Sequence, residues 1–313
     1  MCLGLISLSM QIFKVMKRFI FKNLLFLGII FCVDRISGKV FSYFVDNTKG
    51  GYVGHHQYIN NICDMDVLVF GSSRAIHHYN SKMISDSLGL SCYNCGQDGN
   101  GIILNYGQWH MLKQRYQPKL IIYDVYPKYD LLYGDNHQYL GWLKLYYNRS
   151  GISDIFEKVD KTEKYKMHSM LYRYNYNPLQ VVADFIRPIK EIDKYGFRPL
   201  AGELDTMKIR KDGEMPKSYQ FDAIKLDYLE KMIQERGSTK IVFVISPSWY
   251  GTDNRAFEPL KDICSRENIP IIDFSNSAKF VGNMKFFRDG NHLNADGADE
   301  FTRDLIIKLK NYI

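Results

Sequence analysis

The stretch "DMDVLVFGSSR", residues 64–74, decides the fold. Residues 67–70 form a continuous apolar run that ends in a glycine and two serines, which predicts a strand buried on both faces of a sheet. From Arg74 to Leu88 the pattern becomes helical, and Gly89 follows as a residue that favours the end of a helix. The ordered part of the chain therefore begins with a buried strand that leads directly into a helix.

The same alternation of strand and helix recurs along the chain. Further strands are predicted at residues 90–94, 119–127, 240–247 and 270–274, and helices at residues 101–116, 221–237, 254–268 and 295–312. Five strands alternating with helices predict a doubly wound, flavodoxin-like parallel sheet with helices on both faces, which is a three-layer α/β domain.

The alternation lapses between residues 129 and 220. This segment is rich in tyrosine and carries Trp142. We interpret it as an insertion, or a partly helical cap, after the third strand. Its aromatic side chains either pack the cap onto the domain or stack on sugar rings, and packing is the simpler expectation.

The composition excludes several classes of protein. Lysine and arginine exceed aspartate and glutamate by 41 to 34, and part of this excess crowds the N-terminus at Lys14, Lys17, Arg18 and Lys22. No basic stripe with interleaved aromatic residues stands out, so no nucleic-acid partner is expected. The six cysteines are too scattered for a disulfide scaffold. Cys92 and Cys95, like His77 and His78, lack further ligands at metal-binding spacing, so we expect no metal and no cofactor.

The N-terminal segment has the layout of a signal sequence or signal anchor. Basic residues precede an apolar run from Leu24 to Val33, and Met16 is an alternative start of the chain. We expect an uncleaved anchor; a cleaved signal and a buried helix are the other interpretations. The charge order predicts that the chain after Val33 lies outside the cytoplasm, which is the periplasm if the source is a Gram-negative bacterium. The expected parts are an anchor, a polar linker and an α/β domain, at residues 1–35, 36–64 and 65–313.

Polar residues that could take part in catalysis or binding follow the carboxyl ends of the first two strands, where α/β sheets bind ligands. Ser73 stands at the start of a helix, where free N–H groups favour negative charge, so it is either a nucleophile or a helix cap. Arg74 beside it either binds a substrate carboxylate or phosphate, or is a solvated or sheet-capping residue. The second strand runs into "NCGQDGNG", residues 94–101, whose glycines either let amides approach a substrate oxygen or form a plain turn.

The stretch "FFRDGNHLNADGADEF", residues 286–301, contains a candidate base. A serine nucleophile needs an adjacent base, and the base needs a group that orients it. If Asp289 accepts a hydrogen bond from Nδ1 of His292, Nε2 is left to take a proton from Ser73. Asn294 is expected to cap the last helix, and a surface turn without a partner is the alternative.

Together these motifs resemble a known family. "GSS" after the first strand, "NCGQDG" after the second and "DGNH" before the last helix are similar to blocks I, II and V of the SGNH, or GDSL-like, hydrolase superfamily, over residues 66–313. The resemblance implies that Ser73 is the nucleophile, His292 the base and Asp289 its orienting acid. It also implies that the backbone N–H groups of Ser73 and Gly99 hold the oxyanion.

One departure from the family pattern concerns the oxyanion hole. The block III asparagine should follow the third strand near "YDVYPKYD", residues 123–130, and no asparagine stands there. Asn100 and Asn94 are candidate replacements, and Asn94 is also a candidate substrate contact. The expected function is an extracytoplasmic, membrane-bound serine esterase or O-acyl transferase acting on acyl, such as acetyl, esters of an envelope polysaccharide. The alternative is a glycan-binding or polysaccharide-assembly protein that has lost catalysis.

Overall fold

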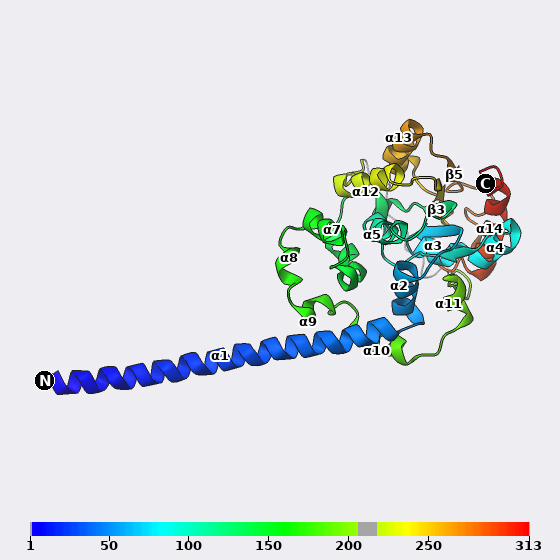
Figure 1. Ribbon diagram of the computed structural model, residues 1–313. Coiled ribbons are helices and arrows are strands. Elements are labelled where there is room, and N and C mark those ends of the chain that lie inside the picture. The colour runs from blue at the N-terminus through cyan, green and yellow to red at the C-terminus, as the bar shows by residue number, and fades with distance from the viewer. Residues whose placement is uncertain (1, 206–217, 313) are drawn as a thin grey trace.

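A parallel sheet lies at the centre of the computed structural model, which describes residues 2–205 and 218–312 and, for residues 2–10, the backbone alone (Figure 1). Its strands are β1 (Val67–Gly71), β2 (Cys92–Asn94), β3 (Leu120–Asp124), β4 (Lys240–Ile245) and β5 (Ile271–Asp273). They lie in the order β2-β1-β3-β4-β5, and every pair is parallel. The predicted doubly wound sheet is confirmed.

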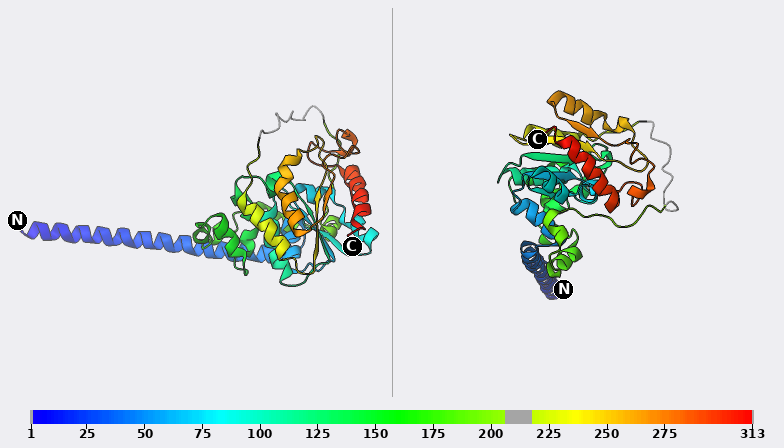
Figure 2. Two further views of the ribbon diagram at one scale, coloured as in Figure 1. Left: turned by 90° about the horizontal axis from the view of Figure 1, so that it is seen from above. Right: turned by 90° about the vertical axis from the view of Figure 1, so that its right-hand side faces the viewer.

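Helices cover both faces of the sheet (Figures 1 and 2). Successive strand residues point to opposite faces, so Leu68 and Phe70 belong to one apolar core and Val67 and Val69 to the other. The first core is covered by α5 (Ile102–Lys113), α12 (Ala223–Gln234) and α13 (Glu258–Glu267). The second is covered by α3 (Ser73–His78), α4 (Ser81–Leu88) and α14 (Ala295–Leu309).

The single helix predicted over residues 74–88 is two helices, α3 and α4. Tyr79 between them has extended backbone angles, φ −104° and ψ 103°, which end α3. Asn80 then caps α4, because its side chain accepts a hydrogen bond of 3.1 Å from the Met83 N–H. This break leaves α3 as a short helix with Ser73 at its start.

Residues 36–64, expected to be a polar linker, are mostly helical. The helix α1 (Cys2–Asn47) runs through the first part of this range and α2 (Gly51–Asn61) through the second. The polar residues of α2 suggested solvent exposure, yet His55, His56 and Gln57 are all buried. Their polar atoms have partners inside the protein; Gln57, for example, donates to the Val45 carbonyl at 3.0 Å. The domain therefore includes α2.

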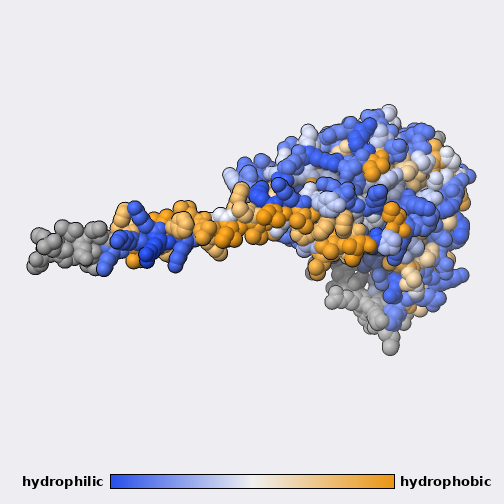
Figure 3. Space-filling model, turned by 60° about the horizontal axis from the view of Figure 1, so that its bottom comes forward, coloured by the Kyte–Doolittle hydropathy of each residue, from blue (hydrophilic) through white to orange (hydrophobic). Residues whose placement is uncertain are grey.

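The N-terminal part of helix α1 projects away from the rest of the chain (Figure 1), and apolar side chains are exposed along its middle (Figure 3). No helix in the described residues is both long enough and apolar enough to cross a membrane. The expected anchor over residues 1–35 is thus not supported. The apolar run Leu24–Val33 lies between Lys22 and Asp34, which keeps it below the roughly 20 residues that span a bilayer.

The tyrosine-rich cap follows β3, as expected. It contains α6 (Pro127–Asp130), α7 (Ile152–Val159), α8 (Glu163–Lys166), α9 (Met170–Arg173), α10 (Pro178–Ile186) and α11 (Glu191–Tyr195). Two 3₁₀ helices, Asn136–Leu140 and Trp142–Tyr146, also lie in it, and two more, Asn254–Phe257 and Met284–Phe286, lie later in the chain. Tyr139, Trp142 and Tyr146 are buried, so much of the aromatic content packs the cap onto the domain. An antiparallel bridge between Leu132 and Phe221 joins the two ends of the insertion.

Candidate active site

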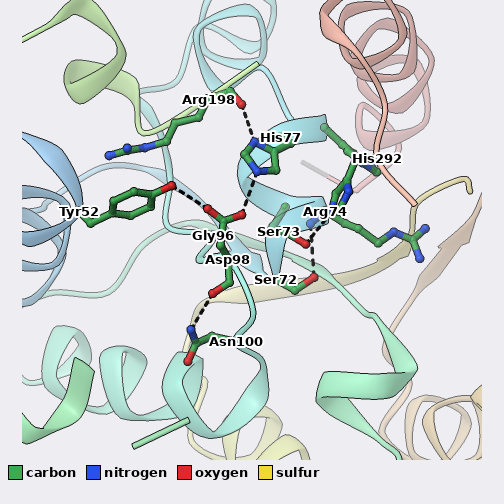
Figure 4. A network of polar contacts seen from close by, with 12 residues as sticks. Tyr52, Ser72, Ser73, Arg74, His77, Gly96, Asp98, Asn100, Arg198 and His292 are labelled. Atoms are coloured by element: carbon green, nitrogen blue, oxygen red, sulfur yellow. Dashed lines mark hydrogen bonds and ion pairs between the residues drawn. The ribbon is translucent and has the colours of Figure 1, made fainter. Parts of the chain in front are cut away.

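The structure brings Ser73 and His292 together at the carboxyl edge of the sheet, although 219 positions separate them in the sequence. Ser73 is the first residue of α3, directly after β1, and His292 lies in the loop before α14. Ser73 Oγ is 2.8 Å from His292 Nε2 (Figure 4). Ser73 is partly exposed although its neighbours Ser72 and Arg74 are buried, so its hydroxyl is the accessible polar group of this turn.

The other ring nitrogen of His292 faces a carboxylate. Nδ1 lies 2.9 Å from both Oδ1 and Oδ2 of Asp289, and Oδ1 also accepts from the backbone N–H groups of Asn291 and His292. Burial alone would raise the pKa of Asp289, but the hydrogen bond and charge of His292, with these two N–H groups, hold it below 3.8. An ionised Asp289 keeps the proton of the neutral ring on Nδ1 and leaves Nε2 as an acceptor for Ser73.

The turn that carries His292 is held rigidly by the protein. The Arg288 N–H donates to the His292 carbonyl at 2.8 Å, and the Leu293 N–H donates to Nε2 of the buried His78 at 3.0 Å. Asn294 accepts from the Gly297 N–H at 2.9 Å and so caps α14 as expected. The imidazole of His292 is therefore fixed from both sides of the turn.

The two backbone N–H groups that are expected to hold an oxyanion are those of Ser73 and Gly99. The N–H of Ser73 belongs to the first residue of α3, where no carbonyl of the same helix can accept it. Gly99 is exposed with φ +67°, and a Cβ added there would meet no atom within 4 Å, so open space surrounds it. The loop of Gly99 lies against the end of β1, because the Gln97 N–H donates to the Gly71 carbonyl at 3.2 Å.

Neither asparagine of the second loop is placed to complete the oxyanion hole. Asn94 is fully buried; its amide donates to the carbonyls of Ala75 and Tyr79, and its oxygen accepts from the Gly96 N–H. Asn94 thus holds the loop against α3 and does not face a substrate, contrary to expectation. Asn100 is 3% exposed and donates to the Asp98 carbonyl at 2.8 Å, so it too is turned into the protein.

Arg74 is not at the mouth of the site. Its side chain is 1% exposed, Nε donates to Ser246 Oγ at 3.0 Å, and the guanidinium lies 5.2 Å from the centre of the Tyr126 ring. These contacts tie the start of α3 to the ends of β3 and β4. The sheet-capping interpretation of this arginine therefore fits the structure, and the substrate-binding one does not.

Sequence reasoning missed the support that α2 gives to the loop of Gly99. His55 Nε2 lies 3.2 Å from the Gly96 carbonyl and His56 Nε2 lies 3.0 Å from Gln97 Oε1. The hydroxyl of Tyr52 donates to Asp98 Oδ2 at 2.8 Å. Three consecutive loop residues, Gly96, Gln97 and Asp98, are thus each held by one residue of α2. Burial lowers the pKa of His55 to about 3, so this histidine is neutral and acts as a plain hydrogen-bond group.

One sequence signal could have pointed to a further part of this arrangement. His77 lies four residues after Ser73, which places both on the same face of a helix. Its Nε2 is 2.8 Å from Asp98 Oδ1, a carboxylate partner that the sequence did not reveal (Figure 4). The two cysteines of the C-x-x-C motif, Cys92 and Cys95, are buried free thiols.

A group that could hold a cation lies in the cap, outside this site. His137, Asp160 and Glu163 are the three residues among those described whose ligand atoms come within 4.8 Å of one another. The ammonium group of Lys166 already lies 2.7 Å from Glu163 Oε1 and 3.5 Å from Asp160 Oδ2. A lysine thus supplies the positive charge that a metal would bring.

Neither a family model nor a curated protein matches the chain. The structure is similar to that of a lipase/acylhydrolase from Enterococcus faecalis, at 15% sequence identity and a TM-score of 0.38, over 79% of this chain and 95% of that one. It is also similar to an acetyl xylan esterase from the rumen bacterium Butyrivibrio proteoclasticus, at 10% identity and a TM-score of 0.37, over 79% of this chain and 63% of that one. Likenesses this distant do not assign an activity. The resemblance to SGNH, or GDSL-like, hydrolases rests on the sheet and on the Ser73–His292–Asp289 geometry of the chain itself.

Proposed function

We propose that this protein is a serine-dependent ester hydrolase or acyl transferase of SGNH type. One observation carries the proposal: Ser73 Oγ, His292 Nε2 and, through Nδ1, Asp289 form a chain of hydrogen bonds of 2.8 and 2.9 Å. This is the set that a serine nucleophile needs, because a hydroxyl attacks well only when a base removes its proton.

The reaction would proceed in two halves. Ser73 Oγ attacks the ester carbonyl while its proton passes to His292 Nε2, and the imidazolium is stabilised by Asp289. The tetrahedral oxyanion is held by the N–H groups of Ser73 and Gly99. When this intermediate collapses, His292 returns the proton to the departing alcohol and an acyl-enzyme remains on Ser73. Water or a second hydroxyl group then accepts the acyl group with His292 again as the base.

The same contacts argue against the alternative of a scaffold that has lost catalysis. That alternative is motivated by the absence of an asparagine at the block III position. A decayed site would be under no constraint to keep a serine partly exposed within hydrogen-bond reach of an oriented histidine. We therefore favour the enzyme.

The substrate class and the location of the enzyme are the finer part of the proposal. We propose acyl esters of an envelope polysaccharide as substrates, because aromatic residues border the turn of His292. The backbone N–H of Trp249 donates to the Gly290 carbonyl at 3.1 Å, and the partly exposed Tyr250 ring packs on Gly290. An exposed aromatic ring suits stacking on a sugar. A site outside the cytoplasm, at the membrane, rests on the charge order around Leu24–Val33 alone.

A serine-directed fluorophosphonate probe tests the core of the proposal on the full-length chain. Wild type is expected to be labelled, Ser73→Ala is expected to lose all labelling, and His292→Ala is expected to react far more slowly. Ser72→Ala is the matched control, because Ser72 is a buried neighbour whose hydroxyl only accepts from the Arg74 N–H. Equal labelling of wild type and Ser73→Ala would refute the assignment.

Two further measurements address the finer part. Incubation with an acetylated glycan and a candidate acceptor glycan distinguishes hydrolysis from transfer, because free acid as the sole product argues against transfer. A C-terminal reporter that is active only outside the cytoplasm tests the location. An inactive reporter on a folded fusion would contradict it.

A further inference from the structure

Both ring nitrogens of His77 face hydrogen-bond acceptors. Nδ1 lies 2.6 Å from the Arg198 carbonyl oxygen and Nε2 lies 2.8 Å from Asp98 Oδ1 (Figure 4). A carbonyl oxygen can only accept a hydrogen bond, and an ionised carboxylate can only accept as well. Both hydrogen bonds can therefore form at once only if His77 is an imidazolium. Its side chain is only 10% exposed, so water does not offer an alternative partner.

Asp98 is the ionised, accepting partner of this contact. Burial alone would raise the pKa of Asp98, but the hydrogen bond and charge of His77, followed by the hydrogen bond from Tyr52, hold it below 3.8. The Tyr52 hydroxyl occupies Oδ2 at 2.8 Å while His77 occupies Oδ1. The two side chains thus form a hydrogen-bonded pair in which His77 is buried and Asp98 is partly exposed.

Other charged and titratable groups surround this pair. The guanidinium of Arg198 lies 4.1 Å from the centre of the Tyr52 ring and 3.8 Å from Asp193 Oδ1. The ring of His292 lies edge-on to that of His77 at 5.7 Å between centroids. The acceptor carbonyl of Arg198 is itself fixed, because the N–H of the same residue donates to the Ile76 carbonyl at 2.9 Å. His77 is therefore clamped between two rigid acceptors.

The position of the pair relates it to the reaction. His77 lies one turn after Ser73 on α3, and Asp98 immediately precedes Gly99, whose N–H is assigned to the oxyanion hole. An unpaired carboxylate at position 98 would repel the negative charge that develops beside Gly99. His77 cancels that charge and also ties the loop to the helix that carries the nucleophile.

We propose that His77 and Asp98 are positioning residues which fix the Gly99 amide and neutralise its surroundings, in an oxyanion hole that lacks the block III asparagine. This role rests on the proposed function of Ser73. It extends that function by assigning work to a second histidine, which touches neither the substrate nor the reacting atoms.

Nuclear magnetic resonance tests the charge state without any assay of activity. The full-length wild-type chain is labelled with ¹⁵N-histidine, and the signals of His77 are assigned by their loss in His77→Ala. We expect both ring nitrogens of His77 to carry protons at about pH 7.5, where an unperturbed histidine with a pKa near 6.5 is mostly neutral. A ring with one unprotonated nitrogen at that pH overturns the ion pair. The charge state is measured on the wild-type protein, and the His77→Ala variant serves only to assign the signals.

Steady-state hydrolysis of p-nitrophenyl acetate tests the role of the pair. His77→Ala is expected to lower kcat about 10- to 100-fold with little change in KM, because the loss falls on the oxyanion and not on substrate binding. The double variant His77→Ala/Asp98→Asn is expected to regain about fivefold or more of that loss, since it removes the stranded carboxylate. His137→Ala removes a histidine that faces acidic groups in the cap and is expected to leave kcat unchanged.

The outcomes separate this inference from the function on which it rests. Absence of Ser73-dependent fluorophosphonate labelling in wild type overturns both. Normal labelling and a wild-type kcat in folded His77→Ala overturn the positioning role alone. A double variant as slow as the single one shows that the loss is a matter of packing, and this also overturns the role proposed for charge.

Discussion

Replacement of Gly96 by alanine tests whether the loop of Gly99 must remain in close contact with α3. A Cβ built on Gly96 would stand 2.4 Å from the backbone nitrogen of Ile76 and 2.8 Å from the Cβ of Ala75. Ordinary contact begins near 3.4 Å, so the loop must withdraw from α3 by about 1.0 Å. Neither obstacle is the end of a flexible side chain. The displacement is therefore expected to fall on the loop, and so on Gly99.

The expected cost of this change has two parts. Overpacking of this kind lowers the free energy of unfolding by about 1–3 kcal/mol, which leaves most domains folded. A misplacement of about 1 Å in a catalytic group can lower the rate about 10²-fold. We therefore expect Gly96→Ala to be folded by thermal unfolding but to hydrolyse p-nitrophenyl acetate with a kcat about 10²-fold below wild type.

The matched control is Gly134→Ala. Gly134 is an exposed cap residue, and a Cβ there would meet nothing within 4 Å, so both stability and kcat should stay at wild-type values. A folded Gly96→Ala protein with wild-type kcat would show that the close approach of loop and helix does not matter to the reaction. The assignment of Gly99 to the oxyanion hole would then fail.

Two further predictions concern carboxylates of the domain. Asp289→Asn should lower kcat about 10²-fold or more at unchanged KM, because His292 loses the group that fixes its tautomer; a kcat within about twofold of wild type would contradict this. Asp130 is fully buried and burial, the largest cause, raises its pKa from 3.8 to about 7. Its folded pKa exceeds its unfolded pKa, so its stabilising contribution is present below about pH 4 and is lost as pH rises through about 7, about 4 kcal/mol in all. Asp130→Asn should therefore flatten the fall in melting temperature between about pH 4 and pH 8 that wild type and the exposed control Asp86→Asn show; parallel curves for all three would contradict this.

The sheet was predictable because its signals are local. The strand at Val67–Gly71 and the strand at Leu120–Asp124 are continuous apolar runs, and such runs mark strands with both faces buried. The break between α3 and α4 was missed because it depends on one capping side chain, Asn80, within a pattern that stays helical on both sides. Local periodicity cannot show whether the tertiary contacts select one continuous helix or two shorter ones.

The linker was misread for a different reason. Buried polar residues look like solvent-exposed ones in a sequence, and α2 buries His55 and His56 against partners some forty positions later in the chain. Only the folded structure supplies those partners. The same holds for Asn94, whose amide seemed free to meet a substrate and instead holds the backbone of α3.

The catalytic candidates were accessible to sequence reasoning because each stands in a short motif, Ser73 directly after β1 and His292 shortly before α14. Ser73 and His292 were paired by motif, and the structure places their side chains 2.8 Å apart. The pair of His77 and Asp98 was not accessible. Neither residue lies in a motif that specifies the other, and their contact depends on how the second loop folds back over α3.

The contacts of α2 with the second loop have a practical consequence for anyone who trims this protein. A chain cut to residues 65–313, the boundary that the sequence suggests, would retain Ser73 and its partners but discard Tyr52, His55 and His56. Such a fragment would keep every residue of the proposed triad, and we still expect it to be a poor catalyst. Its low activity could then be attributed wrongly to the missing block III asparagine, although the cause would be the loss of the α2 side chains that support the loop of Gly99.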